Sequence, residues 1–289
     1  MSADSHPLSP SATFVDMMSK FKHSESAARR ASPRKHASTT AAENKSKKVQ
    51  TRTESSSKPP GKKGKEKIDW DKLPALEDCI QEGLDVLFCG YNPGVASASK
   101  GHHFAGPTNH FWPCLTESGF GLGQKITYLD DTRCPQDFKF GLTNLVARCT
   151  PGADDLSREE MIEGVGPLRA KILRYKPRIV AFIGKEVFRH FVGPAAWKGG
   201  KTFKWGLQPR KIPYGNSSGF GSWKEGLMYV MPSTSGRVAA YLKADKLRMF
   251  TRLKAIVDSL RGGQEVSELD TPGAEEAPTN EEEDDDDRE

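Results

Sequence analysis

Short, continuous runs of apolar residues recur through the middle of the chain, and each run stops at glycine, proline or a polar turn. Runs of this length are typical of strands that are buried on both faces of a sheet. The pattern predicts strands at Leu84–Gly90, Phe140–Arg148, Arg178–Gly184 and in the first part of Leu227–Arg237.

One long segment between these strands has the apolar spacing of a helix. The helix predicted at Ser157–Pro177 begins with a Ser-x-x-Glu capping box, in which side chains satisfy the first backbone N–H groups. Gly164, Gly166 and Pro167 are expected to break or kink this helix, because proline removes a backbone donor and crowds the preceding turn.

Further helical segments follow the other strands. Asn109 is a possible cap for a helix that would carry Pro113 in its first turn, and helices are also predicted at Lys185–Val192 and Lys243–Leu260. Buried strands that alternate with helices predict an α/β fold, with a parallel sheet that helices cover on both faces.

Three of the predicted strands end in unusual polar turns. Their sequences are GYNPG, LTN followed by CTPG, and MPSTSGR. In open parallel sheets the ligand sits beyond the carboxyl ends of the strands. These three turns therefore mark the expected ligand site.

Charge divides the chain into three parts. Residues 1–67 hold 15 basic and 6 acidic side chains, whereas residues 264–289 hold 1 basic and 13 acidic ones. Neither end can bury enough apolar surface to offset the entropy of ordering, so we predict disordered tails at 1–67 and 263–289. The block 68–262 has the size of one domain and is itself basic, which favours a nucleic-acid partner.

The two tails allow more than one function. The basic arm fits a nuclear address or a phosphate-binding tail, although a solvated linker has the same composition. The acidic tail could fold back and speed product release, or it could simply keep a basic protein in solution.

Cysteine spacing and hydropathy argue against disulfide-rich, metal-binding and membrane proteins. The five cysteines lack CxxC spacing, and an odd number argues against a complete disulfide framework. We expect neither a zinc site nor an iron–sulfur cluster. The sequence has no signal peptide and no long apolar run, so we expect a soluble intracellular protein without a membrane partner.

Five segments occur together in an order that resembles the thymine-DNA glycosylase and mismatch-specific uracil-DNA glycosylase family. They are GYNPG, KGHHFAGPTNHFW, TNLVARCTPG, GLQPRKIP and MPSTSGR, and the resemblance covers about residues 72–260. It implies a three-layer α/β/α sandwich with a mainly parallel sheet. It also implies hydrolytic excision of uracil, thymine or damaged pyrimidines from mismatched double-stranded DNA, without metal or cofactor.

The resemblance assigns the chemistry to a neutral side chain. Asn92 in GYNPG matches the family's catalytic asparagine, and Thr150 in CTPG matches a hydroxyl that helps to hold the attacking water. A departing pyrimidine anion leaves a very reactive sugar, so a placed water is enough and a strong base is optional. Taken alone, Asn92 would fit an ordinary turn, and Thr150 would fit a cap.

Further matches concern the flipped-out base. Phe104 matches the aromatic ring that stacks on the base, although a core phenylalanine is the plain alternative. Asn144 matches the residue that hydrogen-bonds the polar edge of the pyrimidine, and the backbone N–H of Tyr91 is implied as a second contact. His103 is expected to line the pocket and His102 to be structural, since neither has the carboxylate partner of a zinc site. Ser97 also occupies a pocket position.

MPSTSGR matches the loop that enters the DNA. The resemblance implies that Ser233, Ser235 and Gly236 hold phosphates and that Arg237 fills the space left by the base, although a surface arginine is the alternative. Ala240 stands where some relatives have a glutamine that contacts the opposite guanine. Because of Ala240, the preference of those relatives for an opposite guanine does not transfer to this chain. Because of Ser97, their acceptance of thymine does not transfer either.

No lysine occupies a matching nucleophile position, so we expect a monofunctional enzyme that leaves an abasic site. We expect a nuclear monomer whose product passes to abasic-site repair proteins. Two alternatives stay open. The domain could be a catalytically inert module that binds DNA or mismatches, or the tails could make the protein a chromatin-tethered scaffold.

Overall fold

The computed structural model describes residues 69–197, 203–215 and 223–264. The tail predicted at 1–67 and nearly all of the tail predicted at 263–289 lie outside the described residues. The described part is an α/β/α sandwich around one five-stranded sheet. The three-layer fold expected from the resemblance is confirmed.

The sheet has the strand order β2-β1-β3-β5-β4. Four strands are parallel, and β4 pairs antiparallel with β5 at one edge. The strands are β1 (Val86–Gly90), β2 (Phe140–Asn144), β3 (Ile179–Ile183), β4 (Gly206–Pro213) and β5 (Glu225–Met231). The mainly parallel sheet predicted from the sequence is therefore confirmed, although β2 ends four residues before the predicted Arg148.

Strand β4 was missed because its pattern is not apolar. Only two of its eight residues, Gly206 and Ile212, are buried, whereas Pro209, Arg210 and Lys211 are exposed. An edge strand is paired on one side only and tolerates proline, so its sequence lacks the signal of the central strands.

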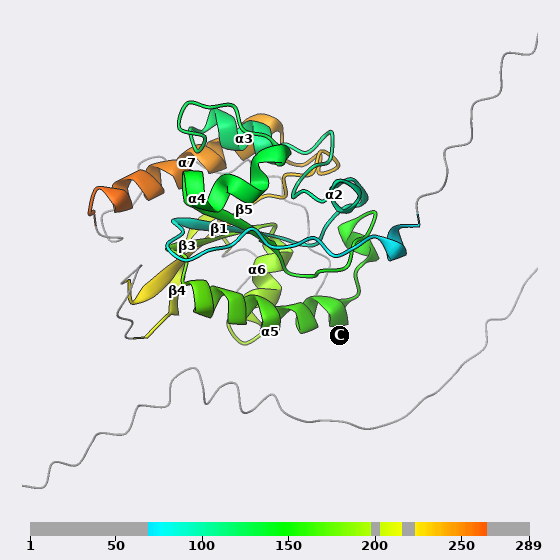
Figure 1. Cartoon of the computed structure of the whole chain (residues 1–289). Helices are drawn as coiled ribbons and strands as arrows, with labels where there is room; N and C mark the ends of the chain where they lie inside the picture. Colours follow the sequence, from blue (N-terminus) through cyan, green and yellow to red (C-terminus); the bar gives the residue numbers. More distant parts are fainter. Residues whose placement is uncertain (1–68, 198–202, 216–222, 265–289) are drawn as a thin grey trace, which may run out of the picture. The chain divides into compact units, whose positions relative to one another are not determined.

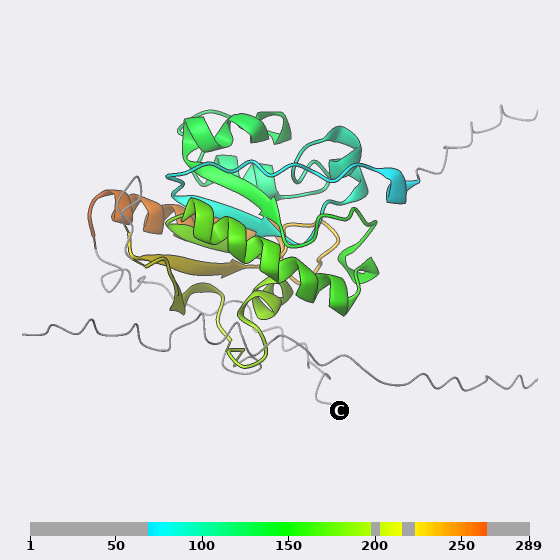
Figure 2. The ribbon, with the colours of Figure 1, turned by 60° about the horizontal axis from the view of Figure 1, so that its bottom comes forward.

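Alternate residues of the central strands build two separate cores. In β1, Val86 and Phe88 face one layer, whereas Leu87 and Cys89 face the other. On the Phe88 side lie α3 (Phe111–Glu117), α4 (Cys134–Phe138) and α7 (Lys243–Arg261). On the other side lie α5 (Arg158–Tyr175) and α6 (Lys185–Val192). Figure 1 shows the sheet between these two layers, and Figure 2 shows α5 running along its face.

Helix α5 runs without a break from Arg158 to Tyr175, with Pro167 inside it. Of the break or kink expected at Gly164–Pro167, the break is wrong and the kink stays a prediction. The Ser157 capping box is present, with the Glu160 N–H donating to Ser157 Oγ at 3.1 Å. Gly164 has a packing role, because a Cβ at this position would collide with the carbonyl oxygen of Leu145. The glycine thus lets α5 pass close to the chain that follows β2.

Two smaller elements differ from expectation. Helix α3 is capped by His110 rather than Asn109, although Asn109 Oδ1 still accepts from the Phe111 N–H at 2.9 Å. Pro113 lies in the first turn, as predicted. A short helix, α2 (Val95–Lys100), directly follows GYNPG and had no apolar pattern to announce it.

Candidate active site

The segments after β1 and β2 run side by side beyond the carboxyl edge of the sheet. Gly90 pairs with Asn144 in the strand register. Past the strands, the Val146 N–H donates to the Tyr91 carbonyl at 2.8 Å, and the Thr150 N–H donates to the Pro93 carbonyl at 3.2 Å. The sheet thereby brings GYNPG and TNLVARCTPG together over their whole lengths, as parallel neighbouring strands require.

The Asn92 side chain is fixed by this neighbouring segment. Its Nδ2 donates to the Arg148 carbonyl at 2.8 Å and to Thr150 Oγ1 at 2.6 Å, and Thr150 Oγ1 donates to the Gly152 carbonyl at 2.6 Å. A carbonyl oxygen can only accept, so the Asn92 nitrogen must face Arg148. With both amide hydrogens committed, Asn92 Oδ1 is the atom that can accept a hydrogen bond from water.

Thr150 is 1% exposed, and its hydroxyl contacts the side chain of Asn92. Its hydroxyl hydrogen goes to Gly152, and one oxygen lone pair accepts from Asn92. The hydroxyl therefore orients the amide, and its direct contact with a water molecule stays a prediction.

Gly90 lies between two predicted base contacts. A Cβ built on Gly90 would stand 2.7 Å from Asn144 Oδ1 and 3.3 Å from the Phe104 ring. The absence of a side chain at Gly90 is what lets the amide of Asn144 and the ring of Phe104 converge above β1. The structure therefore unites Asn144, from β2, with Phe104, from the loop after α2.

Phe104 is held in a backbone conformation that residues other than glycine rarely adopt. Its φ is 52°, in the left-handed region, at a cost of about 1–3 kcal/mol. One face of its ring stacks on Phe111, with centroids 4.1 Å apart and an interplanar angle of 16°. Phe104 is only partly buried and packs against the core, and its role as a stacking surface for a base stays a prediction.

The two histidines have different partners. His103 is 1% exposed, and its Nε2 lies 2.9 Å from the Glu77 carbonyl; burial lowers the pKa of this imidazole. Its ring therefore lies inside the protein, and a contact with substrate stays a prediction. The expectation that neither histidine has a carboxylate partner is wrong, because His102 Nδ1 lies 2.9 Å from Asp131 Oδ1. Ser97 is also buried, and its Oγ accepts from the Ala105 N–H at 3.0 Å.

The loop after β5 joins the same site. The Arg237 guanidinium donates from Nη1 to the Pro151 carbonyl at 2.8 Å, next to Thr150. Gly236 passes so close to Thr108 that a Cβ would lie 2.5 Å from the Thr108 carbonyl oxygen. Within the loop, Ser233 Oγ and Ser235 Oγ accept from the backbone N–H groups of Ser235 and Arg237. The three polar turns predicted from the sequence therefore meet.

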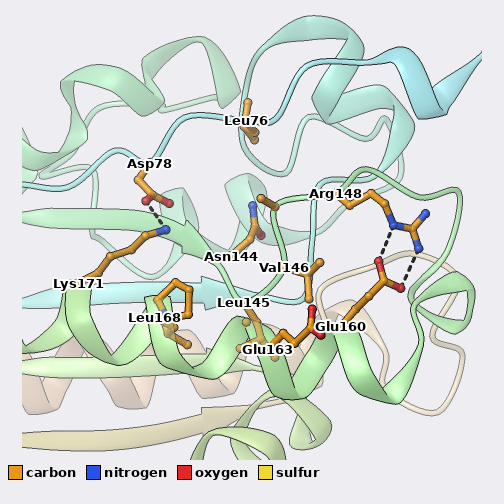
Figure 3. Close-up of a pocket in the computed structure, with 13 residues that line it drawn as sticks. Leu76, Asp78, Asn144, Leu145, Val146, Arg148, Glu160, Glu163, Leu168 and Lys171 are labelled. Carbon is orange, nitrogen blue, oxygen red and sulfur yellow. Dashed lines mark hydrogen bonds and ion pairs between the residues drawn. The ribbon is translucent and has the colours of Figure 1, made fainter.

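A pocket of about 350 Å³ opens beside this site, between α5, residues 76–78 and the chain after β2 (Figure 3). Ion pairs border it: Lys171 lies 2.5 Å from Asp78, and Arg148 lies 2.6 Å from Glu160. Of the predicted site residues, only Asn144 lines this pocket.

Residues 78–258 match the family model described as the uracil DNA glycosylase superfamily. The chain belongs to this superfamily. It is 34% identical, over 194 residues, to a G/U mismatch-specific uracil DNA glycosylase of Schizosaccharomyces pombe, covering 65% of this chain and 55% of the relative. The chain thus spans about half the length of that curated relative.

A solved structure of low sequence identity is also similar. It is the solution NMR structure of a candidate uracil DNA glycosylase from Methanosarcina acetivorans, with 16% identity and a TM-score of 0.38. The similarity covers 63% of this chain and 98% of that one.

Sequence reasoning missed a buried lysine that supports the loop of this uracil DNA glycosylase superfamily member. Lys246, in α7, is 1% exposed, and its Nζ donates to the Ser235 carbonyl at 2.9 Å. Desolvation lowers its pKa. The His110 N–H donates to the Thr234 carbonyl at 2.9 Å, so two backbone oxygens of the loop are anchored. Lysines at helix starts are common, and nothing in the sequence marks this one.

Among the residues that the structure describes, no group of three His, Cys, Asp or Glu side chains lies close enough to hold a metal ion. The helices of residues 69–197, 203–215 and 223–264 include none long and apolar enough to cross a membrane.

Proposed function

We propose that this protein is a monofunctional DNA glycosylase that excises uracil, thymine or a damaged pyrimidine from mismatched double-stranded DNA. The orientation of the Asn92 amide carries the proposal: both of its hydrogens are used inside the protein, which leaves Oδ1 as the atom that can accept from water. Membership of the superfamily supports the same reaction.

The reaction needs only water as a co-reactant. The bond between C1′ of the sugar and the pyrimidine nitrogen breaks, and its electron pair leaves with the base. Water held by Asn92 Oδ1 attacks C1′ and loses a proton to solvent, which gives a free base and an abasic site. A neutral amide suits this role, because the sugar cation is reactive enough to need placement more than basicity.

The base would occupy the space above Gly90. Phe104 offers a ring face opposite the one that rests on Phe111, and Asn144 offers an amide to the polar edge of the pyrimidine. Stacking on such a ring contributes roughly 1–3 kcal/mol per base. Extrusion costs least for a mismatched or damaged base, which favours such substrates.

Arg237 is proposed to enter the DNA when the base leaves the helix. The bond to the Pro151 carbonyl holds its guanidinium beside the Thr150 segment. An exposed backbone acceptor is readily exchanged for a base or phosphate, so the arginine can change partners at little cost.

The segments 90–94 and 143–152 contain no lysine, which supports hydrolysis without a covalent intermediate. Borohydride added during the reaction should therefore trap no protein–DNA adduct. A trapped adduct would contradict the monofunctional assignment. We further propose a nuclear monomer that hands its abasic product to later repair proteins; of these points, the basic arm supports only the nuclear address.

The test uses duplexes that each carry one uracil, thymine or oxidised pyrimidine opposite guanine or adenine, assayed for alkali-labile sites. Wild-type protein should create such sites in at least one duplex, and Asn92→Ala should lose the activity while it still binds DNA. If the wild-type protein binds these duplexes but releases no base from any of them, it is an inert binding module and the proposal fails.

A further inference from the structure

Phe104 is held at its left-handed φ of 52° by contacts on both sides of it in the chain. The backbone N–H and the carbonyl of each of its two neighbours make hydrogen bonds to side chains. On the preceding residue, the His103 N–H donates to Asp131 Oδ2 at 2.8 Å, and its carbonyl accepts from Trp112 Nε1 at 2.9 Å.

The following residue is held in the same way. The Ala105 N–H donates to Ser97 Oγ at 3.0 Å, and the Ala105 carbonyl accepts from Lys100 Nζ at 3.0 Å. Four side chains thus hold backbone groups of the two residues that flank Phe104. Local strain persists only where the surroundings over-determine it, and this loop meets that condition.

Asp131 has a special place among the four. It lies in the 3-10 helix Tyr128–Arg133 and is 1% exposed. Both of its oxygens serve the residues just before Phe104: Oδ2 accepts from the His103 N–H, and Oδ1 lies 2.9 Å from His102 Nδ1. Because a buried carboxylate is costly unless it is paired and hydrogen-bonded, it strongly favours the loop conformation that satisfies it.

We propose that Asp131 is a positioning residue that acts through Phe104: by clamping His102 and the backbone of His103, it keeps the Phe104 ring stacked on Phe111 with its other face ready for an extruded base. The inference rests on the proposed base excision. The 3-10 helix Tyr128–Arg133 would then help to determine the position of the Phe104 ring, although it is distant in sequence from Asn92.

A neighbouring carboxylate provides a matched control. Asp130 lies in the same 3-10 helix and also accepts from a backbone N–H, that of Thr127 at 2.7 Å, but its other partner is Arg133. Asp130→Ala therefore removes a similar capping carboxylate without touching residues 102–104. Asp130→Ala shows what the loss of a carboxylate from this 3-10 helix does when residues 102–104 keep their partners, although Asp130 is the more exposed of the two, at 23% against 1%.

The experiment is a double-mutant cycle on the full chain, read as the single-turnover rate of base release at saturating protein. Asp131→Ala and Phe104→Ala should each slow release by roughly 10-fold or more, given the size of base–aromatic stacking. The double variant should be no slower than Phe104→Ala, because both changes remove the same platform. Asp130→Ala should lower the melting temperature and keep the rate.

The proposal is overturned if the rate reductions of the two single variants multiply in the double variant. It is also overturned if Asp130→Ala slows base release as much as Asp131→Ala does. If Asp131→Ala does not fold, Asp131→Asn takes its place: it retains an acceptor for the His103 N–H and a donor for His102 in its other tautomer. This variant should keep most of the rate, and its full inactivity in a folded protein would count against the clamp.

A second readout does not depend on catalysis. In the full chain with labelled phenylalanine, the Phe104 ring protons should show the upfield shift of a ring stacked on Phe111. This shift should disappear in Asp131→Ala and persist in Asp130→Ala. If the wild-type protein releases no base, the proposed function fails, whereas an unchanged shift in Asp131→Ala refutes the clamp itself.

Discussion

A single methyl group added at Gly90 should lower the rate of base release strongly and the stability of the protein only slightly. The Cβ of Gly90→Ala would stand 2.7 Å from Asn144 Oδ1, and ordinary contact begins near 3.4 Å, so the amide must move by roughly 0.7 Å. The methyl would also press on the Phe104 ring at 3.3 Å. Both groups proposed to bind the base are displaced by one substitution.

The effect on folding should be small by comparison. Gly90 ends a regular strand and has no left-handed φ, so alanine fits its backbone and gains roughly 0.5–1 kcal/mol over glycine. Crowding against Asn144 costs about 1–3 kcal/mol. We expect a net loss of stability of about 0–2 kcal/mol, whereas misplacing catalytic contacts by nearly 1 Å lowers the rate about 100-fold.

The assay compares single-turnover base release and urea unfolding for wild type, Gly90→Ala and Gly94→Ala. Gly94 is the matched control, because it lies in the same GYNPG turn and a Cβ there would meet nothing within 4 Å. Gly94→Ala should keep most of the rate. A folded Gly90→Ala protein with a rate near that of wild type would refute the placement of the base above Gly90.

Three further predictions concern the amide, an ion pair and the basic arm. Thr150→Ala should slow base release roughly 10-fold, because Asn92 loses one of two bonds that orient it, whereas Thr150→Ser should keep most of the rate. Hydrogen bonds from Arg148 hold the pKa of Glu160 at about 2, so this stabilisation is complete above the ordinary carboxyl pKa of 4.5 and is lost as pH falls toward 2. Glu160→Gln should therefore melt below wild type at pH 7, and a gap that persists at pH 2 would contradict this sign. Deletion of 1–67 should weaken DNA binding and flatten its salt dependence, while excision at saturating DNA survives; loss of excision would refute it.

The sequence predicts the central layer of the fold well because burial leaves a simple signal. The strands β1 and β3 are apolar throughout, and β5 is apolar after Glu225, since parallel strands are covered on both faces. The edge strand β4 carries no such pattern, and α5 keeps its helix through Pro167 because its packing on the chain near Leu145 outweighs local propensity. Tertiary contacts decide these elements, and no local pattern encodes them.

The candidate site was predictable as a set of turns but not as a network. The strand-end rule and the resemblance both direct attention to Asn92, Asn144 and Arg237, and the structure brings their segments together. The supporting residues, Asp131 and Lys246, give no signal, because they act on backbone groups that only the folded chain brings near. His103 shows the converse, since a polar side chain in a site motif lies inside the protein.

Three consecutive residues connect the proposed chemistry with the proposed wedge. Thr150 holds the Asn92 amide, the Pro151 carbonyl accepts from Arg237, and the Gly152 carbonyl accepts the Thr150 hydroxyl. If Arg237 enters DNA as proposed, it gives up its bond to the Pro151 carbonyl, and that bond is neither of the two that orient Asn92. The wedge can therefore move without disturbing the amide, so Arg237→Ala should weaken the hold on an extruded base far more than it slows cleavage of a base already bound.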